Sequence, residues 1–297
     1  MKAFVTKYSV SCFIGLAFAI SLLIGFPLKN LFLNDVFAGS EIGMGYLSKI
    51  PVVFGPAIAA IIVTYATLGA AGLKALFSRL TPYIEHIIWW FGLPFAGLAI
   101  TAIAFVIGGF TFGELVTMAT SVSPLVLTMH LAGSIFIIGL GEELGWRGWL
   151  LPKLAQTRTL KNATILVFVS WALWHLPLFF AGYRVAIPFT VIVLALSIIF
   201  TWLWNRVGGN VVVLIIAHAS VDFSEAFFEE RIGPNHSNQV LNAWAAMSAI
   251  YLVIAAVLFF ADRKQWDKIL QPEDERLINI PMIESGEKPI DNADPIS

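Results

Sequence analysis

The stretch Gly141-Glu142-Glu143-Leu144-Gly145-Trp146-Arg147 directly follows a long apolar run, Ser123 to Leu140. Two adjacent carboxylates and an arginine therefore lie at the end of a segment that is long enough to cross a membrane as a helix. Ionisable side chains beside hydrocarbon are costly, and in membrane helices they usually mark function. The rest of the chain is organised around this stretch, by the helices that surround it and the polar groups that reach it.

The composition is that of a polytopic membrane protein. Of the 297 residues, 58% are hydrophobic and only 12% are charged, which is about half the charged fraction of an ordinary soluble domain. The formal net charge is −1 and the sequence has no basic stripe, so we expect no nucleic-acid partner. The single cysteine, Cys12, excludes an intrachain disulfide framework. The expected surroundings are instead the lipid bilayer.

Eight apolar runs are long enough to cross a bilayer as helices, which takes ~20 residues each. They predict an all-α bundle of about eight transmembrane helices, near residues 8–28, 50–70, 87–109, 124–150, 163–181, 185–204, 210–230 and 240–261. The first run exceeds the ~7–15 apolar residues of a signal peptide, so we expect an uncleaved membrane anchor. The chain then divides into N-terminal transmembrane helices 1–3 (1–122), a catalytic transmembrane core (123–262) and a disordered cytoplasmic tail (263–297).

Loop charges predict the orientation of the bundle. With the N-terminus in the cytoplasm, the inside segments carry twelve lysines and arginines and the outside segments carry four, as the positive-inside rule favours. We therefore expect an integral protein of a bacterial plasma membrane with both termini in the cytoplasm. Six tryptophans lie near ends of predicted spans, and we expect most of them to belong to an interfacial aromatic belt: Trp89, Trp90, Trp146, Trp149, Trp202 and Trp204.

The spacing of Glu142, Glu143 and Arg147 predicts different roles for the two carboxylates. Glu143 and Arg147 are four residues apart with the acid first, so on a helix they share a face and can pair. Glu142 lies about 100° further round the helix and is therefore able to point elsewhere. This arrangement gives one carboxylate a structural partner and leaves the other reactive. A simple interfacial ion pair with a spare acid is the alternative.

Two further apolar segments contain polar side chains in helical register. Trp171 and His175 share a face, and Pro177 disturbs the helix just beyond the histidine. His218 and Asp222 also share a face, and a lipid-facing position for both is difficult to explain. These two pairs are the groups most able to join Glu142 in a site.

Helical rise places these groups at one depth in the cytoplasmic half of the membrane. From the cytoplasmic end of its span, His175 is ~18 Å deep, His218 ~12 Å and Glu142 ~14 Å, provided that the fourth span continues to Leu151. We expect Glu142, His175, His218 and Asp222 to form a water-activating site. The reaction class would be peptide-bond hydrolysis inside the membrane.

These residues resemble three motifs of the CAAX protease and bacteriocin-processing family, also called the Abi family, which includes the eukaryotic type II CAAX prenyl endopeptidase. The motifs are EExxxR, FxxxH and HxxxN/D, and the corresponding residues are Glu142-Glu143 with Arg147, Trp171 with His175, and His218 with Asp222. Trp146-Arg147-Gly148 and Leu151-Pro152 also resemble the extended first motif. The resemblance covers roughly residues 124–226.

The resemblance implies an eight-helix, glutamate-dependent endopeptidase that cleaves protein or peptide substrates reaching it from the membrane. Glu142 and His175 would activate water, His218 and Asp222 would form the oxyanion site, and Glu143 and Arg147 would support the geometry. We expect no cofactor.

Asp222 departs from the asparagine of eukaryotic members, and an ionised aspartate has no proton to donate to an oxyanion. Asp222 is therefore protonated, or it orients His218, or the cluster Glu142, His175, His218 and Asp222 binds zinc. Trp171 in place of phenylalanine is a milder change of aromatic ring.

Two other kinds of function stay open. One is a non-enzymatic membrane protein of the bacteriocin-immunity type, since some relatives are linked to self-protection. The other is a transporter that uses the acids and histidines as a proton relay, although the paired broken half-helices typical of transporters are not visible in the sequence. Prenylated CAAX tails are the substrates of eukaryotic members, and nothing in this sequence shows that the protein meets one.

Overall fold

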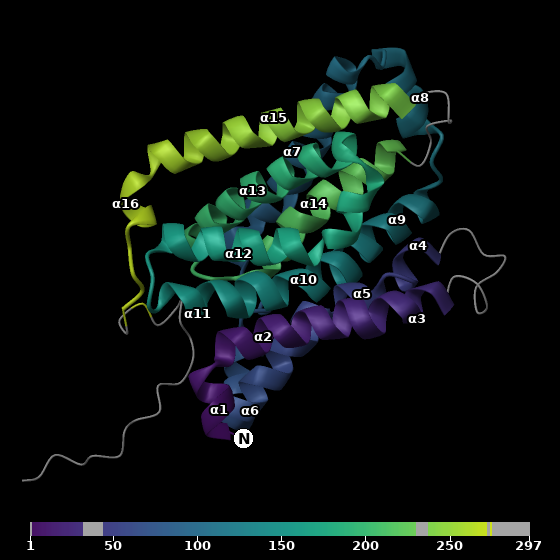
Figure 1. The fold of residues 1–297 in the computed structure, drawn as a ribbon. Helices are drawn as coiled ribbons and strands as arrows, with labels where there is room; N and C mark the ends of the chain where they lie inside the picture. The colour runs from purple at the N-terminus through teal and green to yellow at the C-terminus, as the bar shows by residue number, and fades with distance from the viewer. Residues whose placement is uncertain (1, 32–43, 230–236, 272–273, 275–297) are drawn as a thin grey trace, which may run out of the picture.

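The computed structural model describes residues 2–31, 44–229, 237–271 and 274, and within these ranges the chain is helical and has no strand (Figure 1). The described helices include six that are long and apolar enough to cross a membrane. Two shorter apolar helices, Leu160–Trp174 and Val211–Ser224, occupy the remaining predicted spans. The predicted fold class, an all-α polytopic membrane protein, is confirmed.

The described helices lie side by side in a bundle (Figure 1). In chain order they are α1 (Lys2–Lys7), α2 (Ser9–Phe18), α3 (Phe26–Leu31), α4 (Met44–Leu47), α5 (Ile50–Val53), α6 (Gly55–Ser78), α7 (Ile87–Gly108), α8 (Phe112–Thr120), α9 (Pro124–Gly133), α10 (Leu140–Gly145), α11 (Leu151–Ala155), α12 (Leu160–Trp174), α13 (Tyr183–Arg206), α14 (Val211–Glu229), α15 (Ser237–Ala261) and α16 (Arg263–Trp266). The second span is longer than predicted, because α6 continues past a kink at Gly69, where φ is 65°.

The fourth span, Pro124–Ala155, is one continuous helical segment that contains two π-helical stretches. Two π-helical segments, Ser134–Gly139 and Trp146–Leu150, flank α10, which carries the two adjacent carboxylates. π-Helical turns are uncommon and are frequently found at functional sites. The helix continues through Leu151, as the depth comparison of the sequence required, and Pro152 follows at the second position of α11.

The fifth span ends earlier than predicted. Its α-helix, α12, stops at Trp174, and His175 is the residue that closes it, with φ −85° and ψ 16°. A 3₁₀ segment, Leu176–Ala181, follows in place of the α-helix predicted to residue 181. Pro177 explains the change, since a proline cannot donate the hydrogen bond that would continue the helix. The histidine is therefore presented at a helix end.

Glycines let α10 approach its neighbours at backbone distance. A Cβ atom at Gly141 would lie 2.8 Å from the carbonyl oxygen of Val53, and one at Gly145 would lie 2.6 Å from that of Pro56. Small residues at helix interfaces allow such close packing in membranes. The carboxylate-bearing helix is consequently held firmly against α5 and α6.

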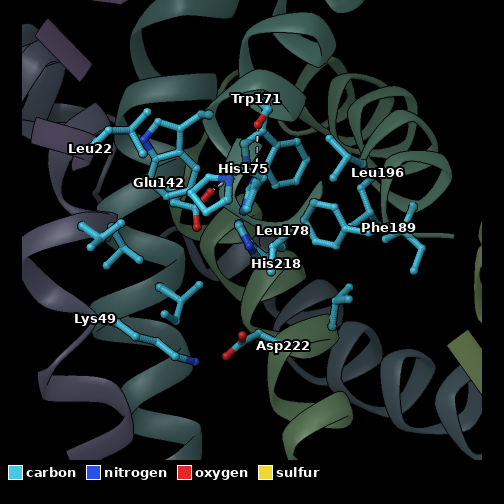
Figure 2. A pocket seen from close by; sticks show the side chains of 18 of the residues that line it. Leu22, Lys49, Glu142, Trp171, His175, Leu178, Phe189, Leu196, His218 and Asp222 are labelled. Atoms are coloured by element: carbon cyan, nitrogen blue, oxygen red, sulfur yellow. Dashed lines mark hydrogen bonds between the residues drawn. The ribbon is translucent and has the colours of Figure 1, made fainter. Parts of the chain in front are cut away.

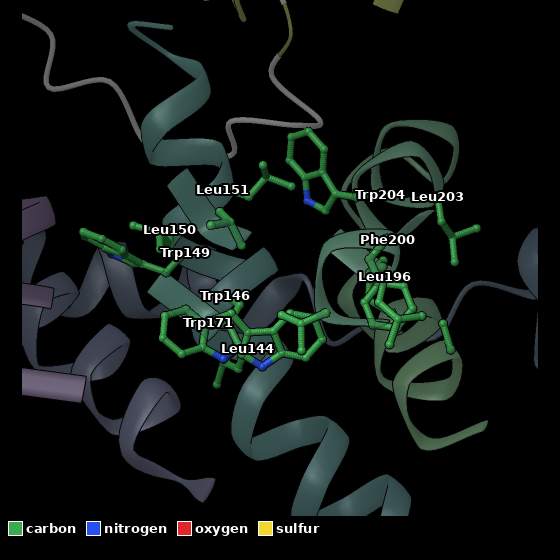
Figure 3. Packing of buried hydrophobic residues seen from close by; sticks show 14 of the residues in the cluster. Leu144, Trp146, Trp149, Leu150, Leu151, Trp171, Leu196, Phe200, Leu203 and Trp204 are labelled. Carbon is green, nitrogen blue, oxygen red and sulfur yellow. The ribbon is translucent and has the colours of Figure 1, made fainter. Parts of the chain in front are cut away.

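Three of the six tryptophans near span ends, Trp146, Trp149 and Trp204, are core residues, and for these three the predicted interfacial belt was wrong. Trp89, Trp90 and Trp202 are partly exposed. Trp146 and Trp204 are fully buried and Trp149 is 8% exposed. Figure 3 shows these rings among the leucines of the fourth span and the side chains of α13. The prediction failed because a position near the end of a span does not reveal whether a side chain faces lipid or a neighbouring helix.

The beginning of the tail is ordered, which corrects the prediction of disorder from residue 263. Trp266 and Leu270 are 2% and 3% exposed. The amide of Leu160 donates to the carbonyl of Lys268, and the amide of Leu270 donates to that of Ala155, at 2.8 and 2.9 Å. The tail thus covers the connection between α11 and α12. Most of the predicted disordered segment, from residue 275 on, lies outside the described residues.

Candidate active site

The structure brings the four candidate catalytic residues to one cavity of about 400 Å³. Glu142 comes from α10, His175 from the end of α12, and His218 and Asp222 from α14 (Figure 2). Apolar side chains of α5, α13 and α14 form much of the remaining wall. A few convergent polar groups in an otherwise apolar cavity are typical of a ligand site.

Glu142 is held in the cavity by an indole. Its side chain is buried, at 3% exposure, and the Nε1–H of Trp171 donates to its Oε2 at 2.7 Å. The sequence analysis left this carboxylate without a partner, so the bond to Trp171 is an addition. Since Oε2 is occupied, Oε1 is the oxygen available for a proton.

His175 has a defined tautomer because its Nδ1 lies 3.0 Å from the carbonyl oxygen of Trp171. A carbonyl can only accept, so Nδ1 carries the hydrogen and Nε2 keeps a lone pair. Trp171 therefore orients both members of the expected water-activating pair, Glu142 through its ring and His175 through its backbone.

Glu143 forms the predicted ion pair and also a second contact that the sequence did not predict. The Nη1 of Arg147 is 2.9 Å from Glu143 Oε1, and both side chains are fully buried. The Nδ1 of His218 lies 2.7 Å from the same oxygen. His218 is thus oriented by Glu143, and among the contacts described none joins it to Asp222. The hypothesis that Asp222 orients His218 has no support in this geometry.

The guanidinium of Arg147 also contacts two aromatic rings of the site. It lies over the ring of Trp171, 4.2 Å from the centroid, and 5.0 Å from that of Phe200. Cations over aromatic faces are attracted most when they are removed from water. Arg147 therefore touches both the Glu143–His218 pair and the indole that holds Glu142.

Asp222 is held from two elements that the sequence analysis missed. The hydroxyl of Ser134, in the first π-helical segment, donates to Asp222 Oδ2 at 2.8 Å. The hydroxyl of Tyr46, in α4, lies 2.9 Å from Ser134 Oγ and 3.4 Å from the same carboxylate oxygen. A serine within an apolar run was the sequence signal for this contact, and by itself that signal is weak.

Lys29 and Lys49 also line the cavity. The sequence analysis counted them as outside loop charges, without a role in the site. The Nζ of Lys49 lies 5.0 Å from the centroid of the Tyr46 ring. The lining of the cavity consequently includes both Glu142 and these two lysines, and Figure 2 shows Lys49 across from Asp222.

The zinc alternative gains no support from the arrangement of donors. Across residues 2–31, 44–229 and 237–271, no three His, Cys, Asp or Glu side chains are grouped closely enough to hold a metal ion.

Comparisons with known proteins agree with the motifs. The family described as Type II CAAX prenyl endopeptidase Rce1-like matches residues 124–224. The chain is also similar to CAAX prenyl protease 2 of Methanococcus maripaludis, with 26% identity over 188 residues. The motifs and both comparisons make the chain similar to CAAX protease-like proteins. The similarity to the archaeal protein covers 60% of this chain and 61% of the length of that relative.

The matched range includes much of the candidate site. Glu142, Trp171, His175, His218 and Asp222 all lie within residues 124–224. Lys29 and Lys49, which also line the cavity, lie before that range, as does Tyr46, whose hydroxyl lies 3.4 Å from Asp222 Oδ2. The N-terminal helices therefore contribute side chains to the cavity although the family match does not reach them.

Proposed function

We propose that the protein is an intramembrane endopeptidase that hydrolyses peptide bonds with water activated by Glu142 and His175. The observation that carries the proposal is the pair of hydrogen bonds from Trp171, which leave one oxygen of Glu142 and the Nε2 lone pair of His175 as acceptors. The similarity to a protein named CAAX prenyl protease 2 supports the same reaction class.

The first step is the activation of water. A water molecule between the two acceptors donates one hydrogen to Glu142 Oε1 and the other to His175 Nε2. Glu142 removes its proton as the water oxygen attacks the carbonyl carbon of the scissile bond. Trp171 stabilises the other oxygen of the carboxylate at 2.7 Å, which fixes the direction from which the proton is taken.

The second step is the collapse of the tetrahedral intermediate. The carbonyl oxygen becomes negative and faces His218 and Asp222, which are the oxyanion side of the cavity. With both ring nitrogens protonated, His218 keeps Nδ1–H on Glu143 and offers Nε2–H to the oxyanion. Glu142 then returns its proton to the leaving nitrogen, the C–N bond breaks, and the products are a carboxylic acid and an amine.

The substrate class follows from the walls and the surroundings of the cavity. Apolar side chains such as Phe189, Ile192 and Leu196 line it beside the polar groups. A protein or peptide that is associated with the membrane, through apolar residues or a lipid, is the proposed substrate. We further propose that the enzyme resides in a bacterial plasma membrane with both termini in the cytoplasm, and that it needs no metal or other cofactor.

The test is cleavage of internally quenched peptides by purified protein in detergent. Glu142→Gln keeps the size of the side chain and removes the base, so cleavage should fall at least 100-fold, in line with the loss of a general base. Glu85→Gln, at an exposed glutamate, is the matched control and should cleave normally. Near-normal cleavage by Glu142→Gln would contradict the mechanism, and retained self-protection by a Glu142→Ala strain would favour an immunity-type protein instead.

A further inference from the structure

We infer that Tyr46 and Ser134 are positioning residues that hold one oxygen of Asp222 so that its other oxygen faces the substrate carbonyl. The inference rests on the proposed peptidase function, and it concerns two residues that none of the family motifs contains. Three separate elements, α4, the π-helical segment Ser134–Gly139 and α14, meet at this point.

The hydrogen-bond directions follow from the number of protons available. Ser134 has one hydroxyl hydrogen, which it donates to Asp222 Oδ2 at 2.8 Å. Ser134 Oγ can then only accept, so the Tyr46 hydroxyl donates to it at 2.9 Å. The contact from Tyr46 to Asp222 Oδ2 is longer, at 3.4 Å. The chain therefore runs from Tyr46 to Ser134 to Asp222 and makes Oδ2 an acceptor.

The two hydroxyl-bearing residues are buried and are not among those that line the cavity. Ser134 is fully buried and Tyr46 is 8% exposed. Gly133 permits this approach, because a Cβ atom there would lie 2.4 Å from the Tyr46 ring. Asp222 itself lines the cavity (Figure 2), and since both hydroxyls contact its Oδ2, Oδ1 is the oxygen left for a ligand.

This arrangement resolves how an aspartate can serve where relatives use asparagine. Since Oδ2 accepts from Ser134, a proton on the carboxyl group resides on Oδ1, where it can donate to the oxyanion. An asparagine in the same network would place its amide oxygen on Ser134 and its NH₂ group toward the cavity. The two hydroxyls thus set the orientation of either side chain, and their effect on catalysis passes through residue 222.

The experiment is a double-mutant cycle on turnover with the full-length protein in detergent and a quenched peptide. Ser134→Ala should lower kcat about tenfold, the order of one lost hydrogen bond, with KM changed less than about twofold. Tyr46→Phe should lower kcat by about threefold, since its contact with Asp222 is the longer one. Gly92→Ala, at an exposed helix position with no atom near the added methyl, is the control.

Repeating Ser134→Ala in the Asp222→Asn and Asp222→Ala variants shows whether Ser134 acts by positioning residue 222 or only by stabilising the fold. In Asp222→Asn, Ser134→Ala should again cost about tenfold in kcat, because the amide loses its anchor. In Asp222→Ala, measured by long single-turnover incubations, Ser134→Ala should cost nothing further. An equal loss in all three backgrounds, or an unchanged kcat in Ser134→Ala, would overturn the inference.

Melting temperatures of the same variants provide a readout that needs no activity. Ser134→Ala and Asp222→Ala should lower Tm by less together than the sum of their single effects, because they remove the same contact. Additive Tm changes would overturn the contact itself. If wild type shows no Glu142-dependent cleavage while this coupling is present, the failure lies with the proposed function, and the catalytic role inferred for the network fails with it.

Discussion

At the scale of single residues, Arg147 contacts both Glu143 and Trp171, the two residues that hold the other polar groups of the site. It pairs with Glu143, which orients His218, and it stacks over Trp171, which holds Glu142. A planar guanidinium can do both at once, whereas an ammonium group cannot reproduce the stack. The residue therefore couples the expected water-activating side of the cavity to the expected oxyanion side.

Replacement of Arg147 tests this coupling. Arg147→Ala removes the arginine partner of the buried Glu143 carboxylate, which keeps only its contact with His218. Breaking a buried ion pair on one side typically costs about 3–5 kcal/mol of stability, so Tm in detergent and turnover should fall together. Arg147→Lys should recover much of the stability and little of the turnover, because it restores the charge and not the stack. The control is Arg158→Ala, at an exposed arginine. An unchanged Tm in Arg147→Ala would show that the pair contributes little.

Asp222 allows a second prediction, which separates water activation by glutamate from metal catalysis. Asp222→Asn should keep substantial activity, because an amide NH₂ can donate to the oxyanion. Wild type should be insensitive to chelators and to added zinc. The measurement is the rate of peptide cleavage by both forms with and without chelator. Loss of activity in Asp222→Asn together with a zinc-restored, chelator-sensitive wild type would establish the metal mechanism, since neutral amides are poor zinc ligands.

At the scale of elements, the close packing of α10 against α5 and α6 fixes the depth of Glu142. Gly145→Ala would bring a methyl group to 2.6 Å from the carbonyl oxygen of Pro56, so a backbone must shift. We expect a loss of about 1–3 kcal/mol of stability and a fall in turnover. Gly92→Ala, in α7, should be neutral because nothing lies within 4 Å of the added atom. Equal Tm values for the two variants would show that α10 can move aside.

The elements also show which contacts a sequence can reveal. The apolar runs predicted the spans, because crossing a bilayer demands a minimum length of helix. The Glu143–Arg147 pair followed from helical spacing, a local rule. His218 reaches Glu143 across 75 residues, and Ser134 reaches Asp222 across 88. Those contacts depend on how whole helices are packed, and no periodicity within one helix specifies them.

At the scale of the whole molecule, the orientation in the membrane decides which compartment the cavity faces. The charge count predicts that a reporter fused after Ala261 reads as cytoplasmic and one near Phe112 as external. The cavity reaches Lys29 and Lys49, at span ends that the count assigned to the outside. If both reporters give the opposite result, the orientation is reversed and these lysines belong to the cytoplasmic side.

The docked tail has a consequence for the synthesis of the protein. The amide of Leu270 donates to the carbonyl of Ala155, more than a hundred residues earlier, and the amide of Leu160 donates to the carbonyl of Lys268. That amide therefore cannot be satisfied by Lys268 until the final stretch has left the ribosome. During translation and insertion, the connection between α11 and α12 stays uncovered for the whole time that α13, α14 and α15 are being made. Emergence of Lys268 and Leu270 from the ribosome, rather than insertion of α15, is the event that allows this end of the bundle to close.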